Sequence, residues 1–335
     1  MHGARDTTGW GRWIRAGAGA ACLVLALVGC GDPPQPPLTV GINTWVGYDP
    51  LVLARDRGMT DRQAIKVVEL ISSGEAVRHL RNGLLDAAAL TLDETLRLAD
   101  SGFDVRIVAL LDASHGADVV LAAPEVRSLT DLRGRAIAVE EASVGTLVLE
   151  RLLKKAGLTR ADVTVVKMES TQHLTALQSG RVEVAVSFAP IEGAIRRAGY
   201  RRIFDSSQMP GEILDVLVVR GEVLRQRPKA VDALLSAWSG GLAVLQLDAV
   251  GAAATLAPGA DLTAREYLDV LKGLRFYAAD ESLQLLAGPV PGLIRLGEPV
   301  AATLETLGLL REPPDWAALI DAAPAERAPH GGLLP

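Results

Sequence analysis

The chain has 335 residues with 34 basic and 40 acidic side chains, which gives a formal charge of −6 at neutral pH. This length allows two domains of ordinary size, each around its own hydrophobic core. The negative charge argues against a nucleic-acid partner. Both cysteines, Cys22 and Cys30, lie within the first thirty residues, which leaves the rest of the chain without cysteine catalysis, cysteine metal ligands or disulfides.

Residues 1–29 have the pattern of a secretory signal peptide. Arg12 and Arg15 precede an apolar run over 16–27, the order of charged and apolar segments that export machinery recognises. The run ends in Leu27-Val28-Gly29-Cys30, a lipobox, so we expect cleavage before Cys30 and lipidation of that residue. An uncleaved anchor helix is the alternative, but the run is too short to span a bilayer comfortably.

A proline-rich tether is expected after the lipidated cysteine, over residues 30–37. Four of these residues are prolines, which favour an extended spacer over a helix or a paired strand. The segment removed with the signal holds three basic residues and one acidic residue, so the exported 306 residues would carry a formal charge of −8.

The next segment, residues 38–122, alternates short apolar runs with helical stretches. The expected strands cover 39–42, 66–71, 86–90, 105–111 and 119–122, and the expected helices cover 50–57, 75–81 and 94–100. Such alternation is typical of parallel strands covered by helices. At the start of the first helix, Asp49 before Pro50 predicts an N-cap.

A second α/β unit is expected over 123–214, followed by a return of the chain to the first unit over 215–320 and a polar tail over 321–335. The second unit has expected strands at 136–140, 163–167 and 182–187. A long strand over 212–220 begins the return, and residues 230–247 have apolar residues at the three- and four-residue steps of an amphipathic helix. We expect extended crossings near 121–124 and 215–219, with a cleft between two lobes.

Several segments of the chain resemble periplasmic substrate-binding proteins of ABC transporters in the nitrate, sulfonate, taurine and thiamine-precursor group. The segments that carry the resemblance are 44–50, 54–58, 83–88, 129–135 and 177–185. In the last of them Glu183 stands where the group usually has aspartate. The resemblance implies an α/β, two-lobed type II periplasmic-binding-protein fold, with C-terminal helices packed on the first lobe. It also implies capture of a small molecule by hinge closure and delivery to an ABC permease with its ATPase.

The candidate ligand contacts of the first lobe lie in loops that follow strands. Ligands of open α/β sheets bind at the carboxyl ends of strands, and these loops hold Trp45, Tyr48, Thr91, Asp93 and His115. The Trp45 indole would stack on a planar ligand or face a cation, although a core tryptophan is the alternative. Asp93 would otherwise cap a helix, and a lone histidine such as His115 is more often solvated or structural.

The candidate contacts of the second lobe and the return crossing are Glu140, Ser143, Phe188 and Asp215. Free N–H groups at the helix start near Ser143 would suit an anion, but Glu140 and Glu141 beside it would repel one. Acid-rich loops with an aromatic residue favour an amine or a nitrogen heterocycle over an oxyanion. The alternative is that these acidic side chains are solvated loop charges with no ligand contact.

These patterns favour a lipid-anchored, monomeric solute-binding protein on the periplasmic face of a bacterial membrane, with no cofactor, no metal and no chemical step. No GxSxG, HExxH, P-loop or post-strand GxGxxG motif is present, so no enzyme class is indicated. A periplasmic sensor of the same fold, signalling to a membrane receptor, is the main alternative. An enzyme of the pyrimidine-synthesis type is less favoured, because its cysteine- and histidine-rich motif is missing.

Overall fold

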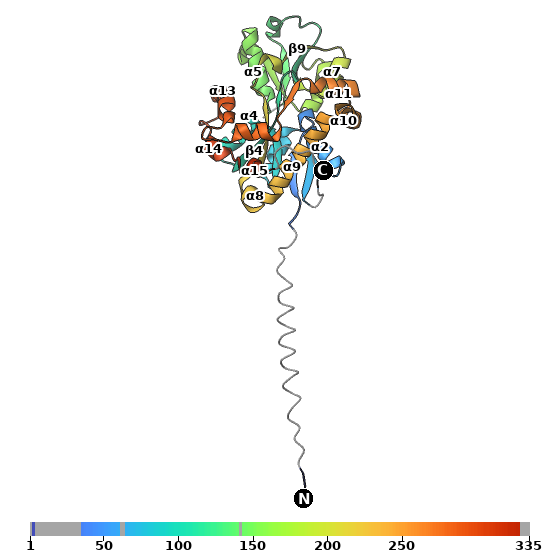
Figure 1. The fold of residues 1–335 in the computed structure, drawn as a ribbon. Coiled ribbons are helices and arrows are strands. Elements are labelled where there is room, and N and C mark those ends of the chain that lie inside the picture. The colour runs from blue at the N-terminus through green and yellow to red at the C-terminus, as the bar shows by residue number, and fades with distance from the viewer. Residues whose placement is uncertain (1, 4–34, 61–63, 141–142, 329–335) are drawn as a thin grey trace. The chain divides into compact units, whose positions relative to one another are not determined.

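The computed structural model describes residues 2–3, 35–60, 64–140 and 143–328. The expected signal peptide, the lipobox Cys30 and most of the expected tether lie outside these residues. Residues from Pro37 onward form one compact unit, which contains all of the described helices and strands (Figure 1).

The first lobe is built on a six-stranded mixed sheet in the order β11-β4-β10-β3-β1-β2. Its strands are β1 (Leu38–Ile42), β2 (Ile65–Glu69), β3 (Ala87–Thr91), β4 (Val105–Ser114), β10 (Leu214–Arg220) and β11 (Leu274–Phe276). Strand β1 pairs in parallel with β2 and β3, whereas β10 runs antiparallel between β3 and β4. The parallel strands are connected through the helices α2 (Asp49–Asp56), α3 (Ser73–Arg81) and α4 (Leu92–Asp100).

The start of α2 differs from the sequence expectation. Asp49 is the first residue of the helix and not its N-cap, which is Tyr48. The Asp49 carboxylate accepts a hydrogen bond of 2.5 Å from the Tyr267 hydroxyl, so this side chain ties α2 to a C-terminal helix. The predicted N-cap is therefore wrong, because a distant donor binds the carboxylate.

The second lobe is built on a five-stranded sheet in the order β7-β6-β8-β5-β9. Its strands are β5 (Asp118–Ala122), β6 (Ala136–Val139), β7 (Thr164–Lys167), β8 (Val184–Phe188) and β9 (Arg201–Asp205). Its helices are α5 (Gly145–Ala156), α6 (His173–Gln178) and α7 (Ile191–Arg197). Strand β5 lies between β8 and β9 in this sheet. The chain therefore crosses between the lobes at 115–117 and again at 206–213, a few residues earlier than the sequence suggested.

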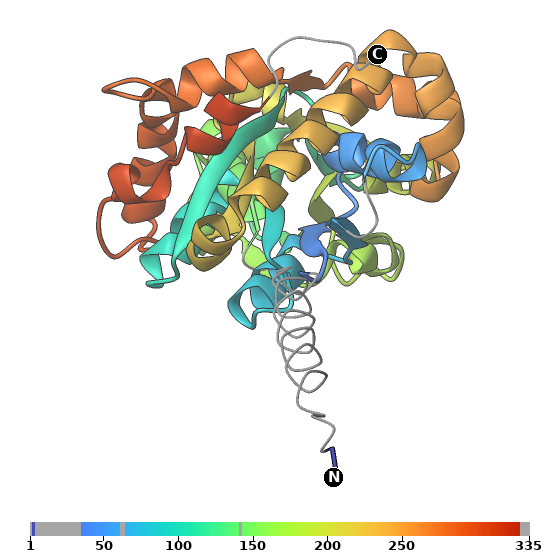
Figure 2. The ribbon, with the colours of Figure 1, turned by 60° about the horizontal axis from the view of Figure 1, so that its bottom comes forward.

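The C-terminal part is helical and packs on the first lobe, as expected (Figures 1 and 2). Its helices are α8 (Gly221–Gln226), α9 (Pro228–Leu247), α10 (Ala249–Leu256), α11 (Ala264–Leu271), α12 (Ala279–Leu286), α13 (Gly292–Thr306), α14 (Trp316–Leu319) and α15 (Ala323–Arg327). Helix α9 approaches α2 so closely that a Cβ atom at Gly241 would lie 1.7 Å from the Pro50 carbonyl oxygen.

Helix α9 is the one helix of the described residues that is long and apolar enough to cross a membrane by length and composition. Its apolar side chains, including Leu234, Trp238 and Leu242, are buried in the core. On its other side Asp232 pairs with Arg327 at 2.9 Å. These contacts are those of a core helix of the first lobe.

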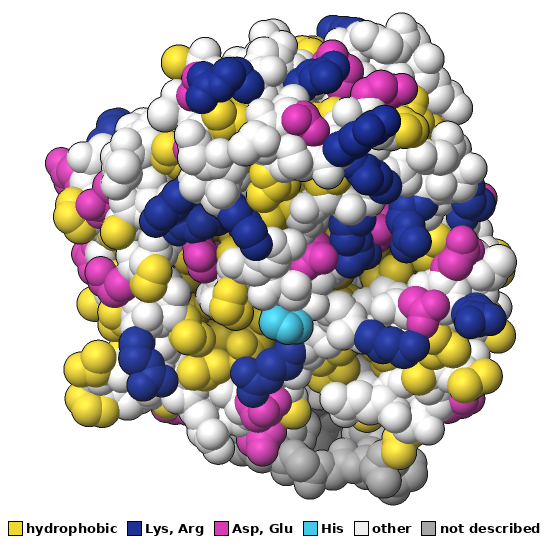
Figure 3. Space-filling view, turned by 90° about the horizontal axis from the view of Figure 1, so that it is seen from above, with side chains coloured by type: hydrophobic (Ala, Val, Ile, Leu, Met, Phe, Trp, Pro, Cys, Tyr) yellow, Lys and Arg dark blue, Asp and Glu magenta, His cyan; other side chains and the backbone are white. Residues whose placement is uncertain are grey.

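Charges of both signs stand side by side on the surface. On the face seen in Figure 3, the Lys and Arg side chains lie among Asp and Glu side chains. Across the protein, many charged side chains form ion pairs between elements, such as Arg197 with Glu266 at 3.1 Å and Arg311 with Asp100 at 3.1 Å.

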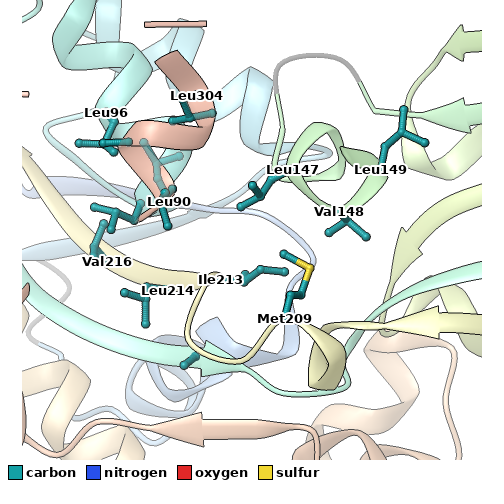
Figure 4. Close-up of a cluster of buried hydrophobic side chains, with 14 of the residues drawn as sticks. Leu90, Leu96, Leu147, Val148, Leu149, Met209, Ile213, Leu214, Val216 and Leu304 are labelled. Atoms are coloured by element: carbon teal, nitrogen blue, oxygen red, sulfur yellow. The ribbon is translucent and has the colours of Figure 1, made fainter. Parts of the chain in front are cut away.

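One hydrophobic core runs through both lobes on the side where the chain crosses between them. It joins Leu90 and Leu96 of the first lobe to Leu147 of the second lobe. Ile213 and Met209 of the return crossing pack between these groups (Figure 4). Because interior packing is dense and apolar burial is favourable, this shared core holds the lobes together at the crossings.

Candidate ligand-binding site

A cavity lies between the two sheets at the ends of their strands. Its described lining comes from both lobes and consists of Asn43, Trp45, Tyr48, Ser73, Thr91, Glu94, Asp118, Glu140, Ser143, Val144, Phe188, Ile213 and Asp215. The cavity has a volume of about 30 Å³, space for a few water-sized molecules. A larger ligand must therefore widen the gap between the lobes as it enters.

Two aromatic side chains of the first lobe are fixed by buried carboxyl groups. The Trp45 indole nitrogen donates to Asp112 Oδ1 at 3.2 Å, and the Tyr48 hydroxyl donates to Asp215 Oδ1 at 2.5 Å. Asp112 and Asp215 are direct neighbours on the antiparallel strands β4 and β10. A side chain at Gly47 would collide with this arrangement, because its Cβ atom would lie 2.4 Å from Asp112 Oδ2.

The aromatic wall of the cavity is shared by the two lobes. Phe188, at the end of β8, meets Trp45 edge to face with 6.0 Å between the ring centroids and an interplanar angle of 69°. Edge-to-face pairs of this kind are favourable beyond their burial. The contact also means that any separation of the lobes moves the two rings apart.

Glu94 reaches the cavity from the first turn of α4. Its Oε2 atom accepts the Thr91 backbone N–H at 3.0 Å, and its Oε1 atom accepts the Ser73 hydroxyl at 2.5 Å. Its neighbour Asp93 does not line the cavity. The Asp93 carboxylate accepts the Thr91 hydroxyl at 2.7 Å and lies 3.9 Å from Arg97.

Asp118 and Glu140 bring two carboxyl groups from the second lobe. They are only 3% and 6% exposed, yet Asp118 Oδ2 and Glu140 Oε1 have no hydrogen-bond partner among the described residues. Asp215 Oδ2 is in the same condition. A buried polar atom without a partner costs stability, so these oxygens leave hydrogen-bonding capacity unused inside the cavity.

The carboxyl groups of the cavity have raised pKa values. Burial, together with the charges of Glu94 and Glu169, raises the pKa of Glu140 to about 8. Burial raises the pKa of Asp118 and of Glu94 to about 7, with Asp93 adding to the shift of each. Burial and the nearby Asp112 and Asp118 carboxyls raise the pKa of Asp215 well above its usual value. The described lining contains no Lys, Arg or His that would offset these acids.

Of the nine residues expected to contact ligand, the structure brings seven into the lining of this one cavity. They are Trp45, Tyr48, Thr91, Glu140, Ser143, Phe188 and Asp215. Asp93 is buried behind Thr91, as described above. His115 is exposed and lies in a different groove on the outside, with Arg197 and Glu266. Strand β4 runs on to Ser114, and the His115 N–H donates to the Gly273 carbonyl, which holds this loop on the outer side.

Other lining residues were not among the candidates, above all Glu94 and Asp118. Glu94 follows Thr91 by three residues, the spacing of a capping box, and that local role concealed its position at the cavity. Asp118 begins a strand that the sequence predicted one residue later, over 119–122, as the last strand of the first lobe. Ser73 also went unnoticed, although a serine next to a helix start is a recognisable signal.

Two α/β sheets with a cavity between them define the class, a two-lobed periplasmic-binding-protein fold. The alkanesulfonate-binding protein SsuA from Xanthomonas axonopodis pv. citri, solved with MOPS, has a TM-score of 0.72 at 20% identity, over 87% of this chain and 99% of that one. The nitrate-binding protein NrtA from Synechocystis PCC 6803 has a TM-score of 0.71 at 12% identity, over 88% of this chain and 89% of that one. These likenesses establish the fold.

The chain belongs to the NMT1-like family, whose family model matches residues 31–255. A putative binding protein from Brucella abortus (strain 2308) is 26% identical over 211 residues. That match covers 60% of this chain and 64% of the relative, so the chain spans less than two thirds of the curated relative's length. The expected resemblance is confirmed in that the chain is a member of the NMT1-like family and has the fold of the sulfonate- and nitrate-binding proteins.

Proposed function

We propose that this chain is the solute-binding component of an ABC importer, and that it captures a small nitrogen-containing molecule between its lobes. The observation that carries the proposal is the cavity itself, which is lined from both sheets by acids and by the aromatic pair Trp45 and Phe188. Aromatic faces and carboxylates together suit amines and nitrogen heterocycles. An oxyanion would meet several carboxyl groups and no described lining cation.

The side chains of the cavity support binding without a chemical step. The hydroxyl groups of Ser73 and Thr91 donate to Glu94 and Asp93, and the Ser143 hydroxyl donates to the Glu140 carbonyl at 3.2 Å. Here the hydroxyls serve to fix the loops.

A thermal-shift screen of the body from Leu38 onward tests this function. The compounds are amines, pyrimidines, amino acids, sulfonates and nitrate, since a ligand that binds the folded state raises its stability by mass action. We expect a shift with amines or nitrogen heterocycles. No shift with any class would contradict solute binding, and slow conversion of a bound compound would indicate an enzyme.

Lipid attachment at Cys30 would hold the protein at the membrane beside its permease and ATPase. We expect Cys30→Ser to move the full chain from the membrane fraction to the soluble fraction, and continued membrane association would contradict the lipobox. Neighbouring permease and ATPase genes would support transport, whereas a lone membrane signalling gene would favour a sensor.

A further inference from the structure

We infer that the ligand binds as a compact organic cation, and that Glu94, Asp118 and Glu140 hold its ammonium or amidinium group where the two sheets face each other. This inference rests on the proposed function and names the charge state of the molecule that is bound. Its starting point is that these three acids come from different parts of the fold, namely α4, β5 and the residue directly after β6, and line one narrow cavity.

The unused hydrogen-bonding capacity of the cavity points to a donor. Asp118 Oδ2 and Glu140 Oε1 are buried, line the cavity and have no partner among the described residues. Glu94 already accepts two hydrogen bonds from neutral groups, but no described cation forms an ion pair with it. A ligand with several N–H groups and a positive charge would satisfy these oxygens and offset their charge.

Two other kinds of ligand fit less well. In the described part of the chain, no group of three or more His, Cys, Asp or Glu side chains is placed to hold a metal ion. The cavity acids share one lining without forming such a group, which favours a polyatomic cation over a bare metal ion. An anion is disfavoured by the carboxyl groups on both sheets.

A cation shared by two lobes also explains how binding would favour closure. Glu94 belongs to the first lobe, whereas Asp118 and Glu140 belong to the second. The charges of Glu94 and Glu140 repel each other, and a positive group between them turns this repulsion into attraction. The ligand then has the differential affinity for the closed state that a conformational change requires.

The charge inference predicts that binding releases protons. The groups that face these three acids are Asp93, Glu169, Asp112, Asp215 and Tyr48, with Arg97 at 3.9 Å from Asp93. Because the pKa values of Glu94 and Asp118 are raised to about 7 and that of Glu140 to about 8, the three acids are largely protonated at pH 6. A permanent cation must displace those protons, so its affinity rises between pH 6 and pH 8.5 by up to about tenfold per pH unit for each proton released.

The test uses three small molecules of similar size on the full chain, purified in detergent. Acetamidine is the cation, acetamide its neutral isostere and methanesulfonate the anion, and calorimetry in two buffers of different ionisation enthalpy counts the protons released. We expect acetamidinium to bind at least tenfold more tightly than acetamide at pH 8.5 and to release protons at pH 7. Tighter binding of acetamide or methanesulfonate, or binding that weakens as the pH rises, overturns the cation and leaves solute binding intact. Binding of no compound here or in the screen fails the proposed function, and this inference with it.

Variants in which an acid is replaced by its neutral isostere test which acids bind the cationic group of the ligand. Asp118→Asn and Glu140→Gln should each lower the affinity for acetamidinium at least tenfold while leaving the thermal midpoint of the free protein unchanged or higher. Glu192→Gln is the matched control, because Glu192 is an equally buried acid of the second lobe that pairs with Arg202 outside the cavity. It should leave the affinity within twofold. Equal losses in all three variants would assign the effect to general folding and overturn the assignment.

Discussion

Asp and Glu side chains line both the cavity between the lobes and the outer groove beside α7 and α11. The two regions differ in whether these acids have cationic partners. The outer groove is larger, with a volume of about 650 Å³. Its acids have cationic partners: Glu192 lies 2.6 Å from Arg202, Glu266 lies 3.1 Å from Arg197, and Asp269 lies 2.6 Å from Lys272. No described lining residue of the inner cavity offers such a partner.

The pKa shifts follow the same division. Hydrogen bonds from Thr263 and Arg197 lower the pKa of Glu266, whereas burial raises the pKa of Glu140 to about 8. Buried acids in folded proteins are usually paired, and unpaired acids with raised pKa values are more frequent at functional sites. The acids of the groove therefore have structural partners within the protein, whereas for those of the cavity we propose a ligand as the partner.

The largest effect is expected from the aromatic wall of the cavity. Trp45→Ala removes a buried indole that packs on Phe188 and donates to Asp112, so it should lower the free energy of unfolding by about 4 kcal/mol. It should also weaken ligand binding. Urea unfolding followed by circular dichroism measures the first effect, and calorimetry measures the second.

Trp45→Phe is the control for that variant. It keeps an aromatic ring but loses the N–H donor to Asp112, so we expect less than half of the stability loss of Trp45→Ala. If the two variants bind ligand as well as the parent protein, Trp45 is a core residue with no part in recognition.

The acids of the cavity should destabilise the free protein as the pH rises. Glu140 has a folded pKa of about 8, above its ordinary value of 4.5, so the folded state holds a proton that the unfolded state loses first. Stability therefore falls between about pH 4.5 and pH 8. Glu140→Gln removes this penalty and should raise the free energy of unfolding at pH 9 by about 2 kcal/mol. A steeper loss of stability with pH in the variant would show that Glu140 is stabilised by a partner.

The sequence predicted the strand-end loops of the cavity well because short-range patterns determine them. Trp45, Glu140 and Phe188 each follow a run of β-branched or small apolar residues that forms a strand. The carboxyl ends of parallel strands meet at one edge of a sheet. The local strand patterns and the rule for strand ends together predicted that these residues lie close to one another. Their contacts with ligand stay a prediction.

The sequence could not predict the residues whose position depends on distant pairing. Asp118 reaches the cavity because β5 is inserted between β8 and β9, which follow it by more than sixty residues. His115 lies outside because β4 extends through Ser114 to pair with β11, near the end of the fold. No local pattern records either pairing, since both depend on which strand ends next to which in the folded chain.

Breaking the ion pair between Glu192 and Arg202 should lower the free energy of unfolding, whereas Glu140→Gln should raise it. The change should also be smaller. Arg202→Met leaves the Glu192 carboxylate, whose side chain is 8% exposed, with Arg196 as its nearest described cation at 3.8 Å. We expect a loss of about 1 kcal/mol in the free energy of unfolding near pH 7. Ligand affinity should not change. A gain in stability, as expected for Glu140→Gln, would contradict the view that acids of the groove are stabilised by cations and acids of the cavity are not.

The smallest effect is expected for the pair between Lys272 and Asp269 at the rim of the groove. Their side chains are 76% and 58% exposed, so water and salt screen the attraction that lowers the pKa of Asp269. Ordering two exposed side chains also costs entropy, which offsets much of the Coulomb gain. Lys272→Met should therefore leave the urea midpoint and the ligand affinity unchanged at physiological salt. A clear loss of stability that persists in high salt would contradict this expectation. It would show that exposed ion pairs also stabilise the groove.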